Sequence, residues 1–281
     1  MPEPRPLAGT SALVTGGGSG IGLAVAVRLA ADGAAVTIAG RSADRLAEGE
    51  AAIRAAAPEA SVTAVPTDVT DEGAVRAAVA AATDAGGGRL DAVVASAGGS
   101  ESIGPVTHLD VEPWERTLAT NLTGTMLALK HGAAAMVRGG GGSFVAISSL
   151  ASTTPHPWFG AYGPAKAGID QLCRQAADEL GPSNVRVNSV CPGLIRTDLV
   201  GFITAGGPVL DSYEANIPLP RIGEVDDVAA LVRFLVGPES TWITGQAINV
   251  DGGHSLRRGP DLSGAIEPLF GADGLRGVVE P

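Results

Sequence analysis

The chain has 281 residues, a formal net charge of −11 and an apolar fraction of 45%. That apolar content fits a globular core and excludes disorder as the main state of the chain. No basic stripe offsets the acidic charge, so nucleic acid and anionic membrane surfaces are excluded as favoured partners.

Short apolar runs rich in Val and Ile alternate along the chain with longer Ala-rich stretches of helical spacing. We predict strands over residues 11–15, 35–39, 61–65, 90–95, 142–148, 185–190 and 247–250. We predict helices over residues 20–32, 43–57, 72–85, 114–138, 161–180 and 226–236. Such alternation is typical of an α/β fold in which helices cover both faces of a parallel sheet.

The predicted elements divide the chain into three parts. Residues 1–10 form an N-terminal extension, residues 11–253 a catalytic domain, and residues 254–281 a C-terminal tail. Residues 197–224 and the tail lack a regular pattern, so we expect irregular structure there. Long irregular segments of compact domains are often lids or binding loops.

A glycine-rich turn follows the first predicted strand, in the run Thr15-Gly-Gly-Gly-Ser-Gly-Ile-Gly22. Glycine permits a tight turn from strand to helix and lets the backbone approach a pyrophosphate. The helix N-terminus then offers free N–H groups and the positive end of its dipole. The spacing Gly-x3-Gly-x-Gly differs from the commoner Gly-x-Gly-x-x-Gly fingerprint. We expect a dinucleotide to bind at Gly16, Gly18, Ser19, Gly20, Ile21 and Gly22.

The end of the second predicted strand carries the residue expected to contact the adenosine ribose. An acidic residue there accepts a hydrogen bond from a free 2′-hydroxyl, whereas an arginine accommodates a 2′-phosphate. The sequence has Arg41 at this point and no acidic residue before Asp44. Because the guanidinium pairs well with phosphate, we favour NADP(H) as the cofactor, with NAD(H) as the alternative. A solvated arginine that opens a helix is the structural alternative.

Tyr162 and Lys166 are four residues apart and share one face of the predicted helix over residues 161–180. Pro164 is tolerated only in a first turn, so this helix should begin near residue 161. An ordinary phenol, with a pKa of about 10, needs help to act near neutral pH. We expect the Lys166 ammonium and a cationic nicotinamide to lower the pKa of Tyr162. Ser149, at the end of a predicted strand, can donate or accept a hydrogen bond toward a substrate oxygen.

In order along the chain, these motifs resemble the short-chain dehydrogenase/reductase family. The matching motifs are the glycine-rich turn, Asp68-Val69, Asn121, Ser149, Tyr162-x3-Lys166, Pro192-Gly193 and Asp251-Gly252-Gly253. The match extends from about residue 11 to residue 253. The resemblance implies a single Rossmann-like domain with a doubly wound parallel sheet of about seven strands.

The resemblance also implies a reaction, in which a hydride passes between the nicotinamide and a carbonyl or alcohol carbon. Tyr162 would be the general acid/base, Lys166 would hold the nicotinamide ribose, and Ser149 would orient the substrate carbonyl. Asn121 would support a water chain for proton relay. Beyond the turn and Arg41, the implied cofactor-binding residues are Asp68, Val69, Ala97, Gly98, Asn121, Tyr162, Lys166, Pro192, Gly193, Ile195 and Thr197.

The sequence departs from the family pattern after the fourth predicted strand, where Ala95-Ser-Ala-Gly98 replaces the usual Asn-Asn-Ala-Gly. Ala95 cannot make the side-chain hydrogen bonds of that first Asn, which usually tie the central strands together. Ala97 and Gly98 still permit close approach to a cofactor, so we expect catalysis to be retained. Asp91, at the start of this strand, is expected to be a structural partner rather than a catalyst.

Residues 197–220 are predicted to form a lid over the site, because they combine many apolar residues with three glycines. The alternative is that these apolar residues simply pack on the core. An apolar pocket suits a small, mostly apolar, cyclic or aliphatic ketone or secondary alcohol. The candidate substrate contacts are His156, Trp158, Phe159, Leu199 and Phe202.

Two other functions are alternatives to this oxidoreductase activity. A 3-oxoacyl-[acyl-carrier-protein] reductase would need clustered Lys and Arg to dock its acidic partner, and such residues are dispersed here. A non-catalytic dinucleotide sensor typically loses the tyrosine or the lysine, and both Tyr162 and Lys166 are present.

The remaining features concern location and assembly. Cys173 and Cys191 lie in apolar segments and are expected to be buried. The four histidines lack metal-ligand spacing, so we expect no metal site. Residues 1–9 do not resemble a signal peptide and no apolar window spans a membrane, so we expect a cytoplasmic protein that does not bind membranes. We predict a homotetramer, or a homodimer, paired through the Ala-rich helices over residues 114–138 and 161–180.

Overall fold

In the computed structural model, which describes residues 5–279, seven parallel strands form one sheet in the order β3-β2-β1-β4-β5-β6-β7. This confirms the predicted α/β fold and its doubly wound, Rossmann-like sheet. The strands are β1 (Ser11–Thr15), β2 (Ala35–Gly40), β3 (Val62–Pro66), β4 (Ala92–Ala95), β5 (Gly142–Ile147), β6 (Val185–Pro192) and β7 (Ala247–Val250).

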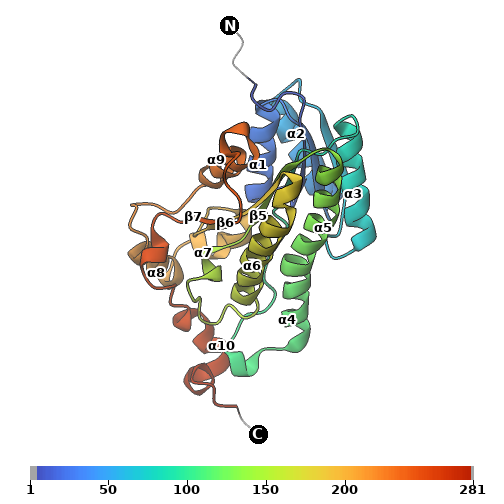
Figure 1. Cartoon of the computed structure of the whole chain (residues 1–281). Helices are drawn as coiled ribbons and strands as arrows, with labels where there is room; N and C mark the ends of the chain where they lie inside the picture. Colours follow the sequence, from blue (N-terminus) through green and yellow to red (C-terminus); the bar gives the residue numbers. More distant parts are fainter. Residues whose placement is uncertain (1–4, 280–281) are drawn as a thin grey trace.

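Helices cover both faces of the sheet (Figure 1). One face carries α1 (Gly20–Ala31), α2 (Ala43–Ala56) and α9 (Val225–Val236), and the other carries α3 (Glu72–Ala85), α5 (Gly124–Arg138) and α6 (Tyr162–Leu180). Alternate side chains of one strand serve the two cores: Val14 packs with the first set of helices and Leu13 with the second. Because both faces are buried, the strands are apolar throughout, which is the pattern that predicted them.

The long helix predicted over residues 114–138 begins at residue 111 and is interrupted by a π-helical turn. It comprises α4 (Val111–Leu118), a π-helical turn (Ala119–Thr123) and α5 (Gly124–Arg138). A π turn inserts one extra residue per turn and is often found at functional sites. Asn121 lies in the middle of this turn and is fully buried.

The segments expected to be irregular contain helices, which corrects that expectation. Residues 197–224 hold α7 (Gly201–Thr204) and α8 (Pro208–Asn216), and the tail holds α10 (Ser263–Leu275). Figure 1 shows α8 and α10 together at one end of the molecule, away from α1, α2 and α9. The backbone N–H of Asp261 donates to Ser212 Oγ at 2.8 Å, which ties the tail to α8. The part of the tail that the structure describes therefore packs against α8.

The central strands are joined by a threonine instead of the asparagine that the sequence lacks. Thr15 Oγ1, at the end of β1, accepts hydrogen bonds from the backbone N–H of Ser96 at 3.2 Å and of Ala97 at 3.3 Å. Asp91 has the structural role expected of it, since its carboxylate accepts from Ser11 N at 3.0 Å and from Arg89 at 2.6 Å. The Ala95 departure is thus compensated by neighbouring hydrogen bonds.

The remaining expectations concern the cysteines, the N-terminal extension and membrane-spanning helices. Cys173 and Cys191 are buried, as expected. Residues 1–4 of the predicted extension lie outside the described residues, whereas Leu7 is buried and its N–H donates to Asp32 O at 3.0 Å. Within residues 5–279, no helix has the length and the apolar character needed to cross a membrane.

Candidate functional site

The glycine-rich turn lies where the strand order reverses, between β1 and its neighbour β4. Gly16 has φ +67°, and a Cβ atom there would lie 2.9 Å from Ala97 N. A Cβ on Gly22 would collide with the carbonyl oxygen of Gly16. Glycine is therefore required at both positions for the turn to close against β4 and α1.

A cavity of about 230 Å³ opens beside this turn. It brings together the turn, the end of β2, the segment after β3 and the segment after β4. The predicted residues that line it are Gly16, Gly18, Ser19, Arg41, Asp68, Val69, Ala97 and Gly98. The structure thus places predicted residues from four strand ends around one space.

The predicted residues after β6 lie apart from this cavity, along the start of α1. The Cβ position of Gly20 is 3.5 Å from Thr197 Cγ2, and Gly193 packs against Asp251. Ile195 pairs with Gly223 through an isolated bridge. The segment after β6 therefore borders the turn from the β6–β7 side of the sheet.

The polar groups at the β2 end of the cavity form a connected set. Thr70 donates to Asp68 Oδ1 from its backbone N at 2.9 Å and from its hydroxyl at 2.7 Å, and these bonds lower the pKa of Asp68. The nearby charge of Arg41 acts in the same direction. Arg45 is a second arginine that lines the cavity, and its backbone N–H donates to Ser42 Oγ at 3.3 Å. Sequence analysis missed Arg45, although its place in the first turn of the helix that follows Arg41 was a usable signal.

Tyr162 and Lys166 lie on successive turns at the start of α6, with Pro164 in the first turn as expected. Lys166 Nζ is 5.4 Å from the centroid of the Tyr162 ring and donates to Ile147 O at 2.9 Å. Lys166 is 4% exposed. Burial lowers the pKa of Lys166 to about 8, because the charged form is poorly solvated there.

The pKa of Tyr162 differs in direction from the expectation. Burial raises the pKa of the Tyr162 phenol, and the Ser149 hydroxyl opposes that rise. Ser149 follows β5, and its Oγ accepts a hydrogen bond from Ala151 N at 3.1 Å. The protein alone therefore favours a neutral phenol, and the positive charge of an oxidised nicotinamide would be needed to favour the phenolate.

Asn121 is fixed by the backbone on both sides of its amide. Nδ2 donates to Gly99 O at 2.6 Å and to Thr117 O at 2.8 Å, while Oδ1 accepts from Gly99 N at 3.3 Å. A Cβ on Gly98 would lie 2.6 Å from Asn121 Oδ1. The π-helical turn and the segment after β4 thus hold each other in place beside Lys166.

Aromatic rings continue from Tyr162 toward the end of the molecule formed by α8 and α10. The Phe159 centroid is 6.0 Å from that of Tyr162 and 5.6 Å from that of His156. His156 is in turn 6.1 Å from Tyr213 and 6.3 Å from His254. Burial lowers the pKa of His156, which favours its neutral form.

Sequence analysis did not single out Tyr213 and His254, which continue this row of aromatic rings. Tyr213 comes from α8 and is 5% exposed, and His254 follows Gly253 and is fully buried. His254 Nδ1 has no hydrogen-bond partner within the described residues. Neither residue lies in a recognisable motif, so only the folded path of the chain brings them together.

The other predicted substrate contacts are less enclosed. Trp158 is half-buried with φ +66°, in the loop that leads to Tyr162. Leu199 is 67% exposed. Phe202 lies in α7, and its side chain is outside the part of the chain that the structure describes. The structure thus places Phe159 beside Tyr162, places His156 beside Phe159, and leaves Leu199 at the surface.

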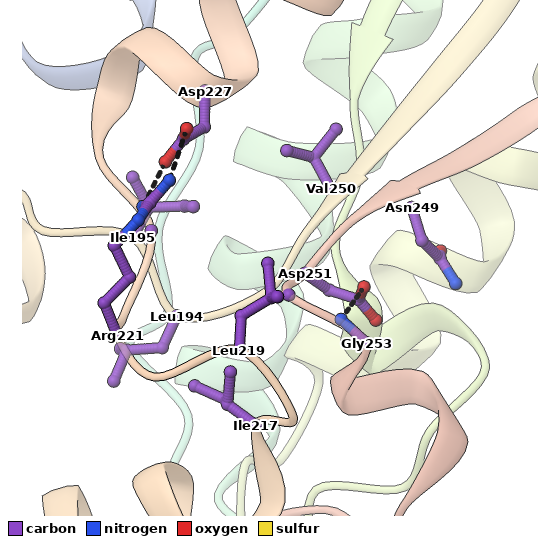
Figure 2. Close-up of a pocket in the computed structure, with 12 residues that line it drawn as sticks. Leu194, Ile195, Ile217, Leu219, Arg221, Asp227, Asn249, Val250, Asp251 and Gly253 are labelled. Carbon is purple, nitrogen blue, oxygen red and sulfur yellow. Dashed lines mark hydrogen bonds and ion pairs between the residues drawn. The ribbon is translucent and has the colours of Figure 1, made fainter.

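A larger cavity, of about 440 Å³, is lined by the segments that follow β6 and β7 (Figure 2). Leu194, Ile217 and Val250 contribute apolar walls. Figure 2 shows Arg221 pointing toward Asp227, with which it forms two hydrogen bonds of 2.6 and 2.9 Å. None of the predicted catalytic residues lines this cavity. Within residues 5–279, no cluster of three or more His, Cys, Asp or Glu side chains could hold a metal ion.

Comparisons with known proteins agree with this geometry. A family model described as enoyl-(acyl carrier protein) reductase matches residues 16–255. Short-chain dehydrogenase/reductase eriH of Hericium erinaceus is 40% identical over 247 residues, covering 86% of this chain and 96% of that protein. Cis-4-hydroxycyclohexanecarboxylate dehydrogenase of Sinomonas cyclohexanicum is 38% identical over 246 residues, covering 87% and 96%. The structure of a short-chain type dehydrogenase/reductase from Mycobacterium ulcerans has 54% identity and a TM-score of 0.95, covering 97% of this chain and 99% of that one.

Proposed function

This chain belongs to the short-chain dehydrogenase/reductase family and is an NAD(P)-dependent oxidoreductase of alcohols and ketones; within that class, we propose that it uses NADP(H) on a small, mostly apolar ketone or secondary alcohol. The bound cofactor supplies the hydride chemistry. The protein contributes orientation, exclusion of water and the movement of a proton.

We propose that Tyr162 carries that proton, as general acid in reduction and general base in oxidation. The observation that carries the proposal is the packing of Tyr162 against the buried Lys166, with the Ser149 hydroxyl close enough to oppose the burial-induced rise of the tyrosine pKa. Ser149 would orient the substrate oxygen toward Tyr162. Lys166 would hold the nicotinamide ribose and stabilise the phenolate through its charge.

The residues present fit a dinucleotide. Gly16 and Gly22 leave no room for side chains, so the turn stays tight and leads directly into α1, whose first N–H groups would bind a pyrophosphate. Asp68 and Val69 would line the adenine pocket, and Asn121, held between Gly99 and Thr117, would support a proton relay. Pro192, Gly193, Ile195 and Thr197 would border the nicotinamide end.

NADP(H) is favoured over NAD(H) because of charge at the end of β2. Arg41 and Arg45 line the same cavity, and Gly40 precedes them without an acidic side chain to bind a free 2′-hydroxyl. Two guanidinium groups suit a 2′-phosphate. Asp68 is the acidic residue of this cavity, and its Oδ1 is bound by Thr70.

The proposed substrate is a cyclic or aliphatic carbonyl compound or alcohol with little charge. Phe159 and His156 extend the site from Tyr162, and Tyr213 adds an aromatic ring from α8. One relative is named for a dehydrogenase of a hydroxycyclohexane carboxylate, a cyclic secondary alcohol, which supports a cyclic substrate. Residues 197–220 would act as the lid, and α10 would pack against α8 behind it.

A 3-oxoacyl-[acyl-carrier-protein] reductase is the alternative, and the chain's net charge of −11 disfavours docking of that acidic partner. We also propose a homotetramer, and a cytoplasmic location that suits the two free, buried thiols.

A substrate panel tests the proposed function. Cyclic ketones, aliphatic ketones, the matching alcohols and 3-oxoacyl thioesters are each assayed with NADPH or NADH by absorbance of the reduced nicotinamide. We expect turnover of cyclic ketones with NADPH as the preferred donor. Turnover confined to acyl thioesters, or equal affinity for the two cofactors, would contradict the proposal.

A further inference from the structure

Asp170 lies one helical turn beyond Lys166 on α6, so that Tyr162, Lys166 and Asp170 follow one another at four-residue spacing on one face. Asp170 is 2% exposed, which makes it as deeply buried as Lys166. Neither the proposed proton transfer nor the proposed cofactor contacts use this carboxyl group. Burying an ionisable group costs free energy, so the presence of Asp170 at this position requires an explanation.

Two side chains of β6 hold the Asp170 carboxyl group. Ser189 Oγ donates to Oδ1 at 2.7 Å, and Cys191 Sγ lies 3.7 Å from both carboxyl oxygens. Both partners are neutral donors, since burial raises the pKa of the Cys191 thiol to about 11. Two donors directed at one carboxyl group match its ionised form, which only accepts hydrogen bonds.

Lys166 is a buried cation that lies one helical turn before Asp170 on α6. Its Nζ donates to Ile147 O at 2.9 Å, so the ammonium is bound by a neutral carbonyl. Burial lowers the pKa of Lys166, and the negative charge of Asp170 is the largest influence in the opposite direction. Because Ser189 and Cys191 hold the carboxylate, it can act as a counter-charge while Nζ binds other groups.

We propose that Asp170 is a positioning residue, whose buried carboxylate is the counter-charge that keeps the Lys166 ammonium protonated while the cofactor binds. The inference rests on the proposed role of Lys166, through which Asp170 would act on the cofactor ribose and on Tyr162. An ammonium is a stronger donor than a neutral amine, and only the ammonium stabilises a phenolate by charge.

Other titratable groups around Lys166 do not replace Asp170. Lys166 faces Tyr162 on its own helix and Cys191 on β6, and Cys173 of α6 faces Asp170. Burial raises the pKa of Cys173 to about 12 and that of Cys191 to about 11, and it also raises the pKa of Tyr162. Of these groups, Asp170 is the only carboxyl group, and the donors Ser189 and Cys191 match its carboxylate form.

The variant Asp170→Asn, made in the full-length chain, tests the proposal because it removes the charge and keeps the shape. Asp178→Asn is the matched control, since Asp178 lies on the same helix at an exposed position. The dissociation constant of NADPH is measured by its fluorescence from pH 6 to pH 9. In the wild type and the control, binding should weaken above about pH 8; in Asp170→Asn it should weaken at lower pH. A fall of one unit in the pKa of Lys166 leaves roughly tenfold less ammonium above both pKa values. An identical pH dependence in the two variants would overturn the proposal.

Unfolding by urea gives a second measurement that does not depend on the cofactor. In the wild-type background, Asp170→Asn should lower the urea midpoint, because it leaves the ammonium uncompensated. In a Lys166→Met background, the same substitution should lower the midpoint much less. Equal losses in the two backgrounds would contradict the proposal. If the single variant does not fold, a folded Lys166→Met/Asp170→Asn chain supports it. If Lys166→Met folds and the double variant does not, the carboxyl group is merely structural.

Lys166→Met also separates this proposal from the proposed function. Unchanged cofactor affinity and turnover in Lys166→Met would mean that Lys166 lacks the role on which the inference rests. If Lys166→Met loses both while Asp170→Asn keeps the pH dependence of the control, the role of Lys166 stands and that of Asp170 fails.

Discussion

At the scale of single residues, the site depends on groups whose ionisation is set by burial. Tyr162 is held neutral by its surroundings, whereas Lys166 has a pKa of about 8 and can lose its charge in mildly alkaline solution. Proton transfer then has different pH dependence in the two directions of the reaction. Alcohol oxidation needs the phenolate, and ketone reduction needs the phenol.

We therefore expect kcat/KM for alcohol oxidation to rise with pH between about pH 6 and pH 9, because the small phenolate fraction of Tyr162 grows with pH and the bound oxidised nicotinamide favours that form. Over the same range, kcat/KM for ketone reduction should stay level, because the raised pKa keeps Tyr162 protonated. Initial rates in both directions, measured at constant ionic strength, check this prediction. Parallel pH profiles in the two directions would mean that another step or another group controls the rate.

Arg41 carries the prediction about cofactor choice. Arg41→Ala removes a charge-assisted pair with the 2′-phosphate, which is worth roughly 1.5–3 kcal/mol, or about 10- to 150-fold in the dissociation constant. NADPH binding should weaken by this factor and NADH binding should change little. Arg76→Ala, at an exposed arginine of α3, is the control. Equal loss of affinity for the two cofactors would show that Arg41 does not contact the phosphate.

Sequence alone indicated the site residues that belong to contiguous motifs. The spacing of Tyr162 and Lys166 on a helix, with Pro164 between them, predicted both their shared face and the start of α6. It could not reveal Tyr213, His254 or the contact of Asp170 with Ser189. Those contacts join distant segments, and each residue type is ordinary in its local sequence.

At the scale of elements, the strands and the long helices follow from hydrophobic pattern, whereas α7, α8 and α10 do not. Two glycines precede Pro208 at the start of α8, and α10 contains Pro268 and a kink at Gly271 with φ +67°. Such residues normally mark loops, so the local pattern predicted irregular structure. Packing against the rest of the fold stabilises these helices instead, as the burial of Ile266 shows.

The segment over residues 197–220 carries a prediction about its motion. Ile203, Tyr213 and Ile217 are buried in a small core of their own, with Leu194 and Ile222, while Leu199 is exposed. We expect hydrogen exchange in residues 197–207 to slow when cofactor and substrate bind, because the lid then closes. The buried end near Tyr213 should already be protected in the free enzyme. Strong protection of residues 197–207 before binding would favour a fixed, packed segment over a lid.

The start of α9 carries a prediction about stability. Arg221 lowers the pKa of Asp227 to about 2, and the N–H of Glu224 also donates to Asp227, at 2.8 Å. A depressed pKa stabilises the fold above the unfolded value of about 4 and loses that effect as pH falls toward 2. Asp227→Asn should therefore lower the free energy of unfolding, measured by urea at pH 7, by about 1 kcal/mol, and the difference should shrink toward pH 2. Asp226→Asn, at the exposed neighbour, should change the midpoint less.

At the scale of the whole molecule, the strand order and the helical layers bring the glycine-rich turn and the start of α6 to the carboxyl ends of the parallel strands. Regular alternation of strands and helices made this arrangement predictable, because parallel strands need crossover helices. The packing of α10 against α8 was not predictable, because it joins the tail to a distant segment of the chain. The sequence therefore indicated the chemistry better than the shape of the substrate pocket.

The proposed assembly is also a property of the whole molecule. Two exposed apolar side chains, Met126 and Val137, lie on α5, which is part of one of the helices expected to pair. Light scattering at micromolar concentration should give a mass of about four times 27.9 kDa for a homotetramer, because association buries these side chains. A mass near that of one chain would refute the assembly.

The central claim is that Tyr162 moves the proton, and Tyr162→Phe tests it most directly. The variant removes one hydroxyl and leaves Lys166 and the aromatic packing in place. Turnover in both directions should fall by about 10²-fold or more, while the dissociation constant of NADPH stays near the wild-type value. Tyr213→Phe, at the only other tyrosine of the chain, is the comparison and should retain most of its turnover. Substantial turnover by Tyr162→Phe, with cofactor binding intact, would contradict the account.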